Sequence, residues 1–255
     1  MIRVLDLTKR FDDFTAVDHV TLTVEPGEIL GFLGPNGAGK STTVKMLTCM
    51  MQPTQGTAEI AGFDIQRDPI EVKRRIGYIP ESGAMYETLT PAEYLDFVAS
   101  LYHMNPDMAR ARFNDLLEIF GILHARDQQL SELSKGMKQK VLIASALLHS
   151  PDVLFLDEPL NGLDANAAMV VKELLKKLAA QGKTIFFCSH ILEVVERICT
   201  RIIIIDKGQQ IIAGTSESIT RETDSVSFED AFSRITGIRD AGDLSDDFLA
   251  ALERV

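Results

Sequence analysis

The chain has 255 residues, of which 45% are hydrophobic and 25% are charged, and this composition is typical of a globular protein with a large apolar core. The length predicts one large domain, or one domain with an appendage, rather than two full-size domains. The net charge of -11 opposes nonspecific nucleic-acid binding, because that binding depends on lysine and arginine side chains that neutralise phosphates.

The sequence predicts a cytoplasmic protein with reduced thiols. It contains no run of about 18 apolar residues, which a membrane-spanning helix requires. The first ten residues include four charged side chains and lack the apolar middle of a signal peptide. The cysteines share no spacing typical of zinc or redox sites, and they are Cys49, Cys188 and Cys199.

The first third of the chain is predicted to be mostly β-structure. Apolar and polar residues alternate over 2–7 and 20–24, which indicates half-buried strands. After a turn at Pro26 and Gly27, the apolar run 28–33 is typical of a buried parallel strand, and glycines and a helical pattern follow it. Further strands are expected at Ile60, Ile65 and 76–79.

From residue 90 the pattern changes to helix. Thr90 can cap a helix, Pro91 suits its first turn, and Glu93 completes a capping box. A second helix is predicted over 108–120, so the stretch from about 83 to 150 is expected to form a helical insert.

The following stretch predicts a parallel βαβ unit. Apolar runs at 153–156 and 184–188 are typical of strands, and the segment 165–181 between them is predicted to be helical. The segments 201–206 and 209–213 predict a hairpin that closes the core.

Residues 215–255 are predicted to form an acidic C-terminal extension to a domain of residues 1–214, since they include ten acidic and four basic residues. The apolar residues between 228 and 235 fall on one face of a helix, which Gly237 can end. A second short helix is predicted around 248–252.

Residues 34–41 fit the phosphate-loop pattern G-x-x-x-x-G-K-[ST], between a predicted strand and a predicted helix. The glycines let backbone N–H groups point at phosphates, and the helix N-terminus adds positive potential. Lys40 is predicted to reach the β- and γ-phosphates, and the Ser41 hydroxyl to bind Mg²⁺. A glycine-rich turn without function is the alternative, which the matching context disfavours. The predicted nucleotide-binding residues here are Gly34, Pro35, Asn36, Gly37, Ala38, Gly39, Lys40, Ser41 and Thr42.

Two carboxylates follow the apolar strand 153–156, at the edge where parallel sheets bind ligands. Asp157 is predicted to hold the Mg²⁺ shell, and Glu158 to polarise the attacking water as a general base. A simple acidic turn is the alternative, and the phosphate loop makes it less favoured. A kinase would need an acceptor-binding site, for which the sequence gives no sign.

Together with further motifs, these residues resemble the ATP-binding cassette (ABC) ATPases, specifically the nucleotide-binding subunits of two-component exporters. The segment 133–140, Leu-Ser-Lys-Gly-Met-Lys-Gln-Lys, resembles the signature motif of that family, and the resemblance covers residues 1 to about 214. Three further matches are the D-loop at 161–164, the switch histidine His190, and Phe11 at the position that stacks on adenine.

The resemblance implies an α/β fold with a P-loop NTPase core and a parallel sheet, an N-terminal antiparallel β subdomain and an inserted helical subdomain. It implies ATP and Mg²⁺ as cofactors, a head-to-tail dimer of cassettes, and ATP hydrolysis at the cytoplasmic face of the cell membrane. A separate transmembrane permease subunit is expected to contact the surface near 81–89, with Met85 and Tyr86 as candidate contacts.

The family also implies roles for single residues. Glu158 and His190 are expected to be catalytic, and Asp164 to link the two sites of the dimer. Lys138 and Lys140 are predicted to belong to a solvated helix face. The residues expected to face the nucleotide of the opposite subunit are Ser134, Lys135, Gly136 and Met137.

The chain departs from the family pattern at three positions. Glu81 replaces the usual Q-loop glutamine, and its carboxylate is predicted to approach Mg²⁺ together with Ser41 and Asp157. Lys135 replaces a glycine and adds positive charge near the nucleotide. Met137 replaces a glutamine and cannot hydrogen-bond a ribose.

Three classes of function remain at this point. The favoured one is an exporter ATPase subunit without a nucleic-acid partner, and an importer subunit stays open within that class. A soluble cassette ATPase that acts on nucleic acid or the ribosome is the alternative, but such proteins usually have two cassettes or basic insertions. A nonhydrolysing regulator would more naturally lack Glu158. The sequence does not identify the transported substrate.

Overall fold

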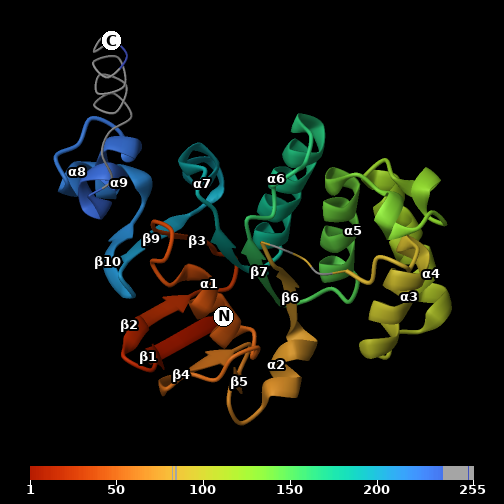
Figure 1. Cartoon of the computed structure of the whole chain (residues 1–255), viewed down its shortest axis with the longest axis horizontal. Helices are drawn as coiled ribbons and strands as arrows, with labels where there is room; N and C mark the ends of the chain where they lie inside the picture. The colour runs from red at the N-terminus through yellow and green to blue at the C-terminus, as the bar shows by residue number, and fades with distance from the viewer. Residues whose placement is uncertain (82, 84, 238–251, 253–255) are drawn as a thin grey trace.

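A computed structural model describes residues 1–81, 83, 85–237 and 252. In this part of the chain a 4-stranded antiparallel sheet lies beside a 6-stranded sheet that is mostly parallel (Figure 1). The smaller sheet has the order β2 (Phe14–Val24), β1 (Ile2–Phe11), β4 (Gln55–Ile60), β5 (Phe63–Asp64). The larger sheet has the order β10 (Gln209–Gly214), β9 (Arg201–Asp206), β3 (Ile29–Leu33), β8 (Thr184–Cys188), β7 (Val153–Asp157), β6 (Ile76–Ile79).

The hairpin of β1 and β2 is longer than the sequence predicts. Strands are confirmed at 2–7 and 20–24, and they continue to Phe11 and Phe14. Three register shifts interrupt the pairing along β1, and each shift changes which residues face the core. The first shift lies between Val4 and Leu7, so Leu5 and Asp6 are both exposed and simple alternation fails after residue 4.

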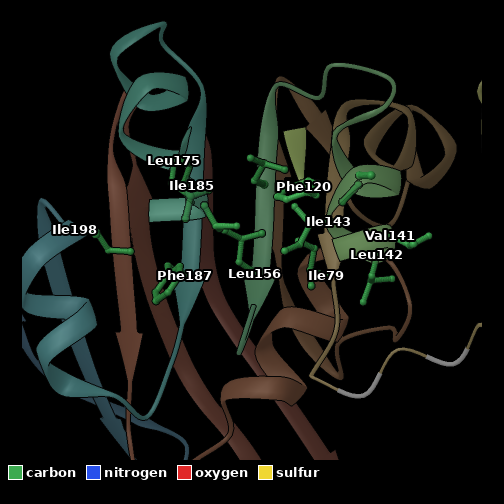
Figure 2. Packing of buried hydrophobic residues seen from close by; sticks show 14 of the residues in the cluster. Ile79, Phe120, Val141, Leu142, Ile143, Leu156, Leu175, Ile185, Phe187 and Ile198 are labelled. Atoms are coloured by element: carbon green, nitrogen blue, oxygen red, sulfur yellow. The ribbon is translucent and has the colours of Figure 1, made fainter. Parts of the chain in front are cut away.

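The larger sheet separates two hydrophobic clusters. The strands β3, β7 and β8 are fully buried, as their apolar runs predict. Neighbouring side chains on β8 point to opposite faces, so that Phe186 and Phe187 belong to different clusters. In Figure 2, Phe187 lies in the cluster that also contains Leu156 and Leu175.

Helices cover this sheet and extend beyond its β6 edge. The phosphate loop leads into α1 (Lys40–Leu47), and α2 (Pro69–Arg75) precedes β6. The predicted helix 165–181 is confirmed as α6 (Ala165–Ala180). Short helix α7 (Leu192–Ile198) follows β8. Neither α2 nor α7 was predicted, because seven residues give too little helical periodicity.

The predicted helical insert contains α3 (Pro91–Leu101), α4 (Pro106–Ile119) and α5 (Lys135–Leu147) (Figure 1). Both halves of the predicted capping box are present, since Glu93 N–H donates to Thr90 Oγ1 at 3.2 Å and Thr90 N–H donates to Glu93 Oε2 at 2.8 Å. Helix α4 begins two residues before the predicted start because the Asn105 side chain caps it.

Between β10 and residue 237 the structure has two helices. The polar helix α8 (Ser216–Glu222) was not predicted, and the Thr215 side chain caps it. The predicted helix near 228–235 is confirmed as α9 (Phe228–Thr236), which ends at Gly237 with φ 67°. Phe228 and Ala231 are buried in the same cluster as residues of α7. The second predicted helix, around 248–252, lies outside the described residues except for Leu252.

Within the described ranges, no helix combines the length and the apolar character needed to cross a membrane.

Candidate functional site

A hollow of about 370 Å³ lies between the tip of the β1–β2 hairpin, the start of α1 and the ends of β6, β7 and β8. The carboxyl ends of parallel strands are where such sheets bind ligands. The hollow brings together most of the predicted nucleotide, metal and catalytic residues. Its lining consists of Phe11, Phe14, Ala16, Asn36, Gly37, Gly39, Lys40, Ser41, Thr42, Glu81, Asp157, Glu158 and His190.

The phosphate loop needs its glycines. Gly37 and Gly39 have φ angles of 81° and 104°, which L side chains rarely adopt. A Cβ atom on Gly39 would collide with the carbonyl oxygen of Ala16 on β2. The ammonium of Lys40 donates to the carbonyl oxygens of Gly34 at 2.6 Å and Pro35 at 3.0 Å, which places it over the loop. A lysine and a helix N-terminus thus meet in one place, and both attract anions.

Asp157 ends strand β7 and is buried, with 3% of its surface exposed. Burial raises the pKa of Asp157, and the nearby carboxylates of Glu81 and Glu158 raise it further. The Ser41 hydroxyl and the Lys40 ammonium act in the opposite direction. The site therefore has an excess of negative charge, which a bound divalent cation would neutralise.

The donors in the hollow fit Mg²⁺ in kind, because hydroxyl and carboxylate oxygens are the ligands that this ion prefers. Among the residues that the structure describes, no group of three or more His, Cys, Asp or Glu side chains is arranged to hold a metal by itself. In proteins Mg²⁺ is usually bound by one or two carboxylates together with phosphate oxygens, and the carboxylates of the hollow fit that arrangement in kind.

Glu158 is held in a fixed and strained conformation. Its φ angle is 51°, and only 7% of its surface is exposed. Its Oε2 accepts from the Ser189 hydroxyl at 3.1 Å, and its Oε1 accepts from the His190 backbone N–H at 2.7 Å. The Nδ1 atom of His190 lies 2.8 Å from the same Oε1. Strained residues of this kind persist where the surrounding structure fixes them, and they cluster at functional sites.

The signature residues lie outside the hollow, on the segment that begins α5. The Ser134 hydroxyl accepts from the Met137 backbone N–H at 3.2 Å and caps this helix. A Cβ atom on Gly136 would lie 2.5 Å from the carbonyl oxygen of Gly162, so α5 touches the D-loop segment directly. The side chain of Lys135 is exposed, and its methylene groups lie against Gly162.

Two side chains of α5 also bind the segment that follows Glu158. Gln139 donates to the carbonyl oxygen of Pro159 at 2.9 Å, and the Lys140 ammonium lies 3.1 Å from Asp164. The prediction of a solvated helix face is wrong for Lys140, whose side chain is only 14% exposed. Asp164 also caps α6 by accepting from the Ala167 N–H at 2.8 Å. Both interactions hold the pKa of Asp164 below its usual range.

Sequence reasoning missed three residues of the site. Phe14 and Ala16 line the hollow, and Ser189 hydrogen-bonds Glu158. The signal for Phe14 is the short turn that places it opposite Phe11 across the hairpin. No local pattern marks Ser189, because its partner lies 31 residues earlier in the chain.

Comparisons with known proteins agree with this geometry. The model of the ABC transporter family matches residues 17–161. The ABC transporter ATP-binding protein NatA of Bacillus subtilis (strain 168) is 40% identical over 225 residues, which cover 86% of this chain and 91% of that protein. The Nod factor export ATP-binding protein I of Burkholderia pseudomallei (strain 1710b) is 39% identical, covering 81% of this chain and 68% of that protein. A dimeric ATP-binding cassette solved in a post-hydrolysis state with ADP and Pi has a TM-score of 0.78 and 26% identity, covering 84% of this chain and 98% of that chain.

Proposed function

Because the chain belongs to the ABC transporter family, we propose that it is the ATP-binding and ATP-hydrolysing subunit of an exporter and acts with a separate permease subunit. The observation that carries this proposal is the hollow, where Lys40, Asp157 and Glu158 converge from distant segments. Export is favoured by the relative named for Nod factor export and by the signature with Lys135.

In this proposal the loop 34–42 holds the triphosphate of ATP, and Phe11 stacks on the adenine. Lys40 donates to the β- and γ-phosphate oxygens. The residues that would hold Mg²⁺ are Ser41, Asp157 and Glu81, and the ion supplies positive charge to the phosphate oxygens when bound.

Glu158 is the proposed general base. It takes a proton from the water whose oxygen forms the new bond to the γ-phosphorus, while the bond from that phosphorus to the leaving ADP oxygen breaks. The backbone of His190 and the hydroxyl of Ser189 keep the carboxylate in place. The imidazole of His190, which is more than half exposed, is proposed to contact the γ-phosphate.

The active unit is proposed to be a head-to-tail dimer, in which residues 134–137 of one chain face the nucleotide held by the other. Asp164 lies beside this segment and is proposed to connect the two sites. The ATP-binding domain is proposed to be residues 1–214, with the helical insert at about 83–150 and residues 215–255 as an acidic extension. The subunit is proposed to lie on the cytoplasmic face of the membrane, with its permease partner at the surface near 81–89.

A cassette that acts on nucleic acid or the ribosome is disfavoured. The net charge of -11 repels phosphate backbones, and the chain lacks a large basic insertion.

The proposal is tested by measuring phosphate release from ATP by the purified chain. Release is expected with Mg²⁺ and is expected to stop when EDTA removes the ion. A chain that binds ATP and Mg²⁺ but never releases phosphate, alone or with its permease, would contradict the hydrolytic role.

A further inference from the structure

Two phenylalanines share the tip of the β1–β2 hairpin. Phe11 and Phe14 are directly paired across the strands, on either side of a two-residue turn in which Asp12 has φ 48°. Side chains that are directly opposite each other in an antiparallel pair point to the same face of the sheet. Both rings also line the hollow, although 42% of Phe11 and 62% of Phe14 remain exposed to solvent.

Strand β2 fixes the position of Phe14 relative to the phosphate loop. Ala16 lies two residues further along the same strand and also lines the hollow. The carbonyl oxygen of Ala16 lies against Gly39 of the phosphate loop. Phe14 is therefore only two residues from the point where β2 meets that loop. A ligand with phosphates at Lys40 and a flat apolar group at its other end fits this layout.

One face of the Phe11 ring is already occupied. The Lys9 ammonium lies 5.2 Å from the ring centroid and also donates to the carbonyl oxygen of Gln52 at 2.8 Å, which fixes it there. A base that stacks on Phe11 must therefore use the other face of the ring. Contact with Phe14 adds apolar surface that Phe11 alone does not supply.

We propose that Phe14 is a second aromatic contact for the base of the bound nucleotide, so that the hairpin tip holds the base with two rings. This inference rests on the proposed nucleotide-binding function and adds a residue to its site. Aromatic rings contact the face of a base and do not read its hydrogen-bonding edge. The contribution of Phe14 is thus the same for adenine and guanine nucleotides and is zero for a phosphate chain without a base.

The first experiment compares Phe14→Ala with the wild-type chain by calorimetric titration of Mg-ATP, Mg-GTP and inorganic tripolyphosphate. The affinity for both nucleotides is expected to fall by about 5-fold or more, the size of one lost stacking contact, while the affinity for tripolyphosphate stays unchanged. Leu5→Ala is the matched control, because Leu5 is 60% exposed on β1 and does not line the hollow.

The outcomes separate the two proposals. Equal losses for the nucleotides and tripolyphosphate would mean that Phe14 only supports the phosphate loop, and unchanged nucleotide affinity would mean that it makes no contact. Either result overturns the inference and leaves the nucleotide site standing. A wild-type chain that binds neither ATP nor GTP would overturn the proposed function instead.

A second variant tests contact directly. The chain contains no tryptophan, so Phe14→Trp places a single indole at the hairpin tip and keeps an aromatic ring there. Its fluorescence is expected to change on addition of ATP or GTP and to stay constant with tripolyphosphate. The same signal with all three ligands, or with none, would contradict a contact between this position and the base.

Discussion

The hollow contains features that destabilise the fold, whereas the signature segment contains contacts that stabilise it. The hollow contains a buried carboxylate with a raised pKa at Asp157 and a left-handed backbone at Glu158, and both features lower the stability of the fold. The signature segment instead has stabilising polar contacts, since Ser134 caps its helix and Lys140 pairs with Asp164. The hollow, where the chemistry is proposed to occur, therefore contains destabilising features of both charge and backbone.

The two regions also differ in how complete they are. The hollow combines an anion site, candidate metal ligands and a candidate base within one chain. The segment at 134–137 is partly exposed and has no acidic residue in the first turn of its helix, while Lys135 adds a positive charge there. A lysine at a helix N-terminus is unfavourable by itself, and an anion beside it would remove that penalty. This difference fits a site that is completed by a second subunit.

The largest expected effect comes from Glu158→Gln. The amide keeps the shape of the carboxylate but cannot take the proton, so hydrolysis is expected to fall by about 100- to 10,000-fold while ATP binding persists. ATP that is bound and not hydrolysed should then hold the two chains together. Size-exclusion chromatography with Mg-ATP should show a dimer.

Glu193→Gln is the matched control, because this glutamate is exposed and lies three residues after His190. It should behave as the wild type does. If Glu158→Gln hydrolyses ATP at the wild-type rate, or stays monomeric with ATP bound, the proposed division of roles between the hollow and the signature segment is wrong.

Next in size is Lys40→Ala. This change removes the ammonium above the phosphate loop, and the loss of charge-assisted hydrogen bonds is expected to weaken ATP binding by about 10- to 100-fold. Lys45→Ala, on the exposed face of the same helix, should leave the affinity unchanged. Calorimetry on both variants checks the assignment, which an unaltered affinity in Lys40→Ala would refute.

Much of the candidate site can be predicted from the sequence because its patterns are local. The phosphate loop, Asp157 and the Ser134 cap each follow from a few consecutive residues and the element beside them. Phe14 follows only from its pairing with Phe11 across the hairpin turn, and Ser189 depends on a contact between distant loops that no local pattern carries. Lys140 was predicted to be solvated from its charge alone. Its ion-pair partner, Asp164, lies on another loop and could not be identified from the sequence.

Lys140→Met tests whether the two regions are coupled. The variant keeps most of the apolar length of the side chain and loses the ion pair with Asp164, which ties α5 to the segment after Glu158. An ion pair with one exposed partner contributes little, so we expect hydrolysis to fall only a few-fold and ATP affinity to stay unchanged. Lys138→Met is the control on the same helix, because Lys138 pairs with Glu87 instead.

The expected pattern is a lower hydrolysis rate in Lys140→Met alone. Equal hydrolysis rates in Lys140→Met and Lys138→Met would mean that the ion pair with Asp164 does not couple the signature segment to Glu158. A loss of ATP affinity in Lys140→Met would show that the hollow itself had been disturbed.

The smallest expected effect concerns stability at Asp157. A carboxyl whose pKa is higher in the folded state than in the unfolded state binds its proton more tightly when folded, so its ionisation destabilises the fold as pH rises through that range. Asp157→Asn removes this buried charge and is expected to raise the melting temperature by a few degrees at neutral pH. At a pH below the unfolded pKa the two proteins should differ less, because both then hold an uncharged group.

Asp152→Asn, at the opposite end of the same strand, replaces an exposed carboxylate that pairs with Lys183 and should give no such gain. Thermal unfolding without nucleotide, measured across pH, checks the sign. A lower melting temperature for Asp157→Asn at neutral pH would mean that Lys40 and Ser41 fully compensate the buried charge, and that strain in the hollow resides in the backbone of Glu158 alone.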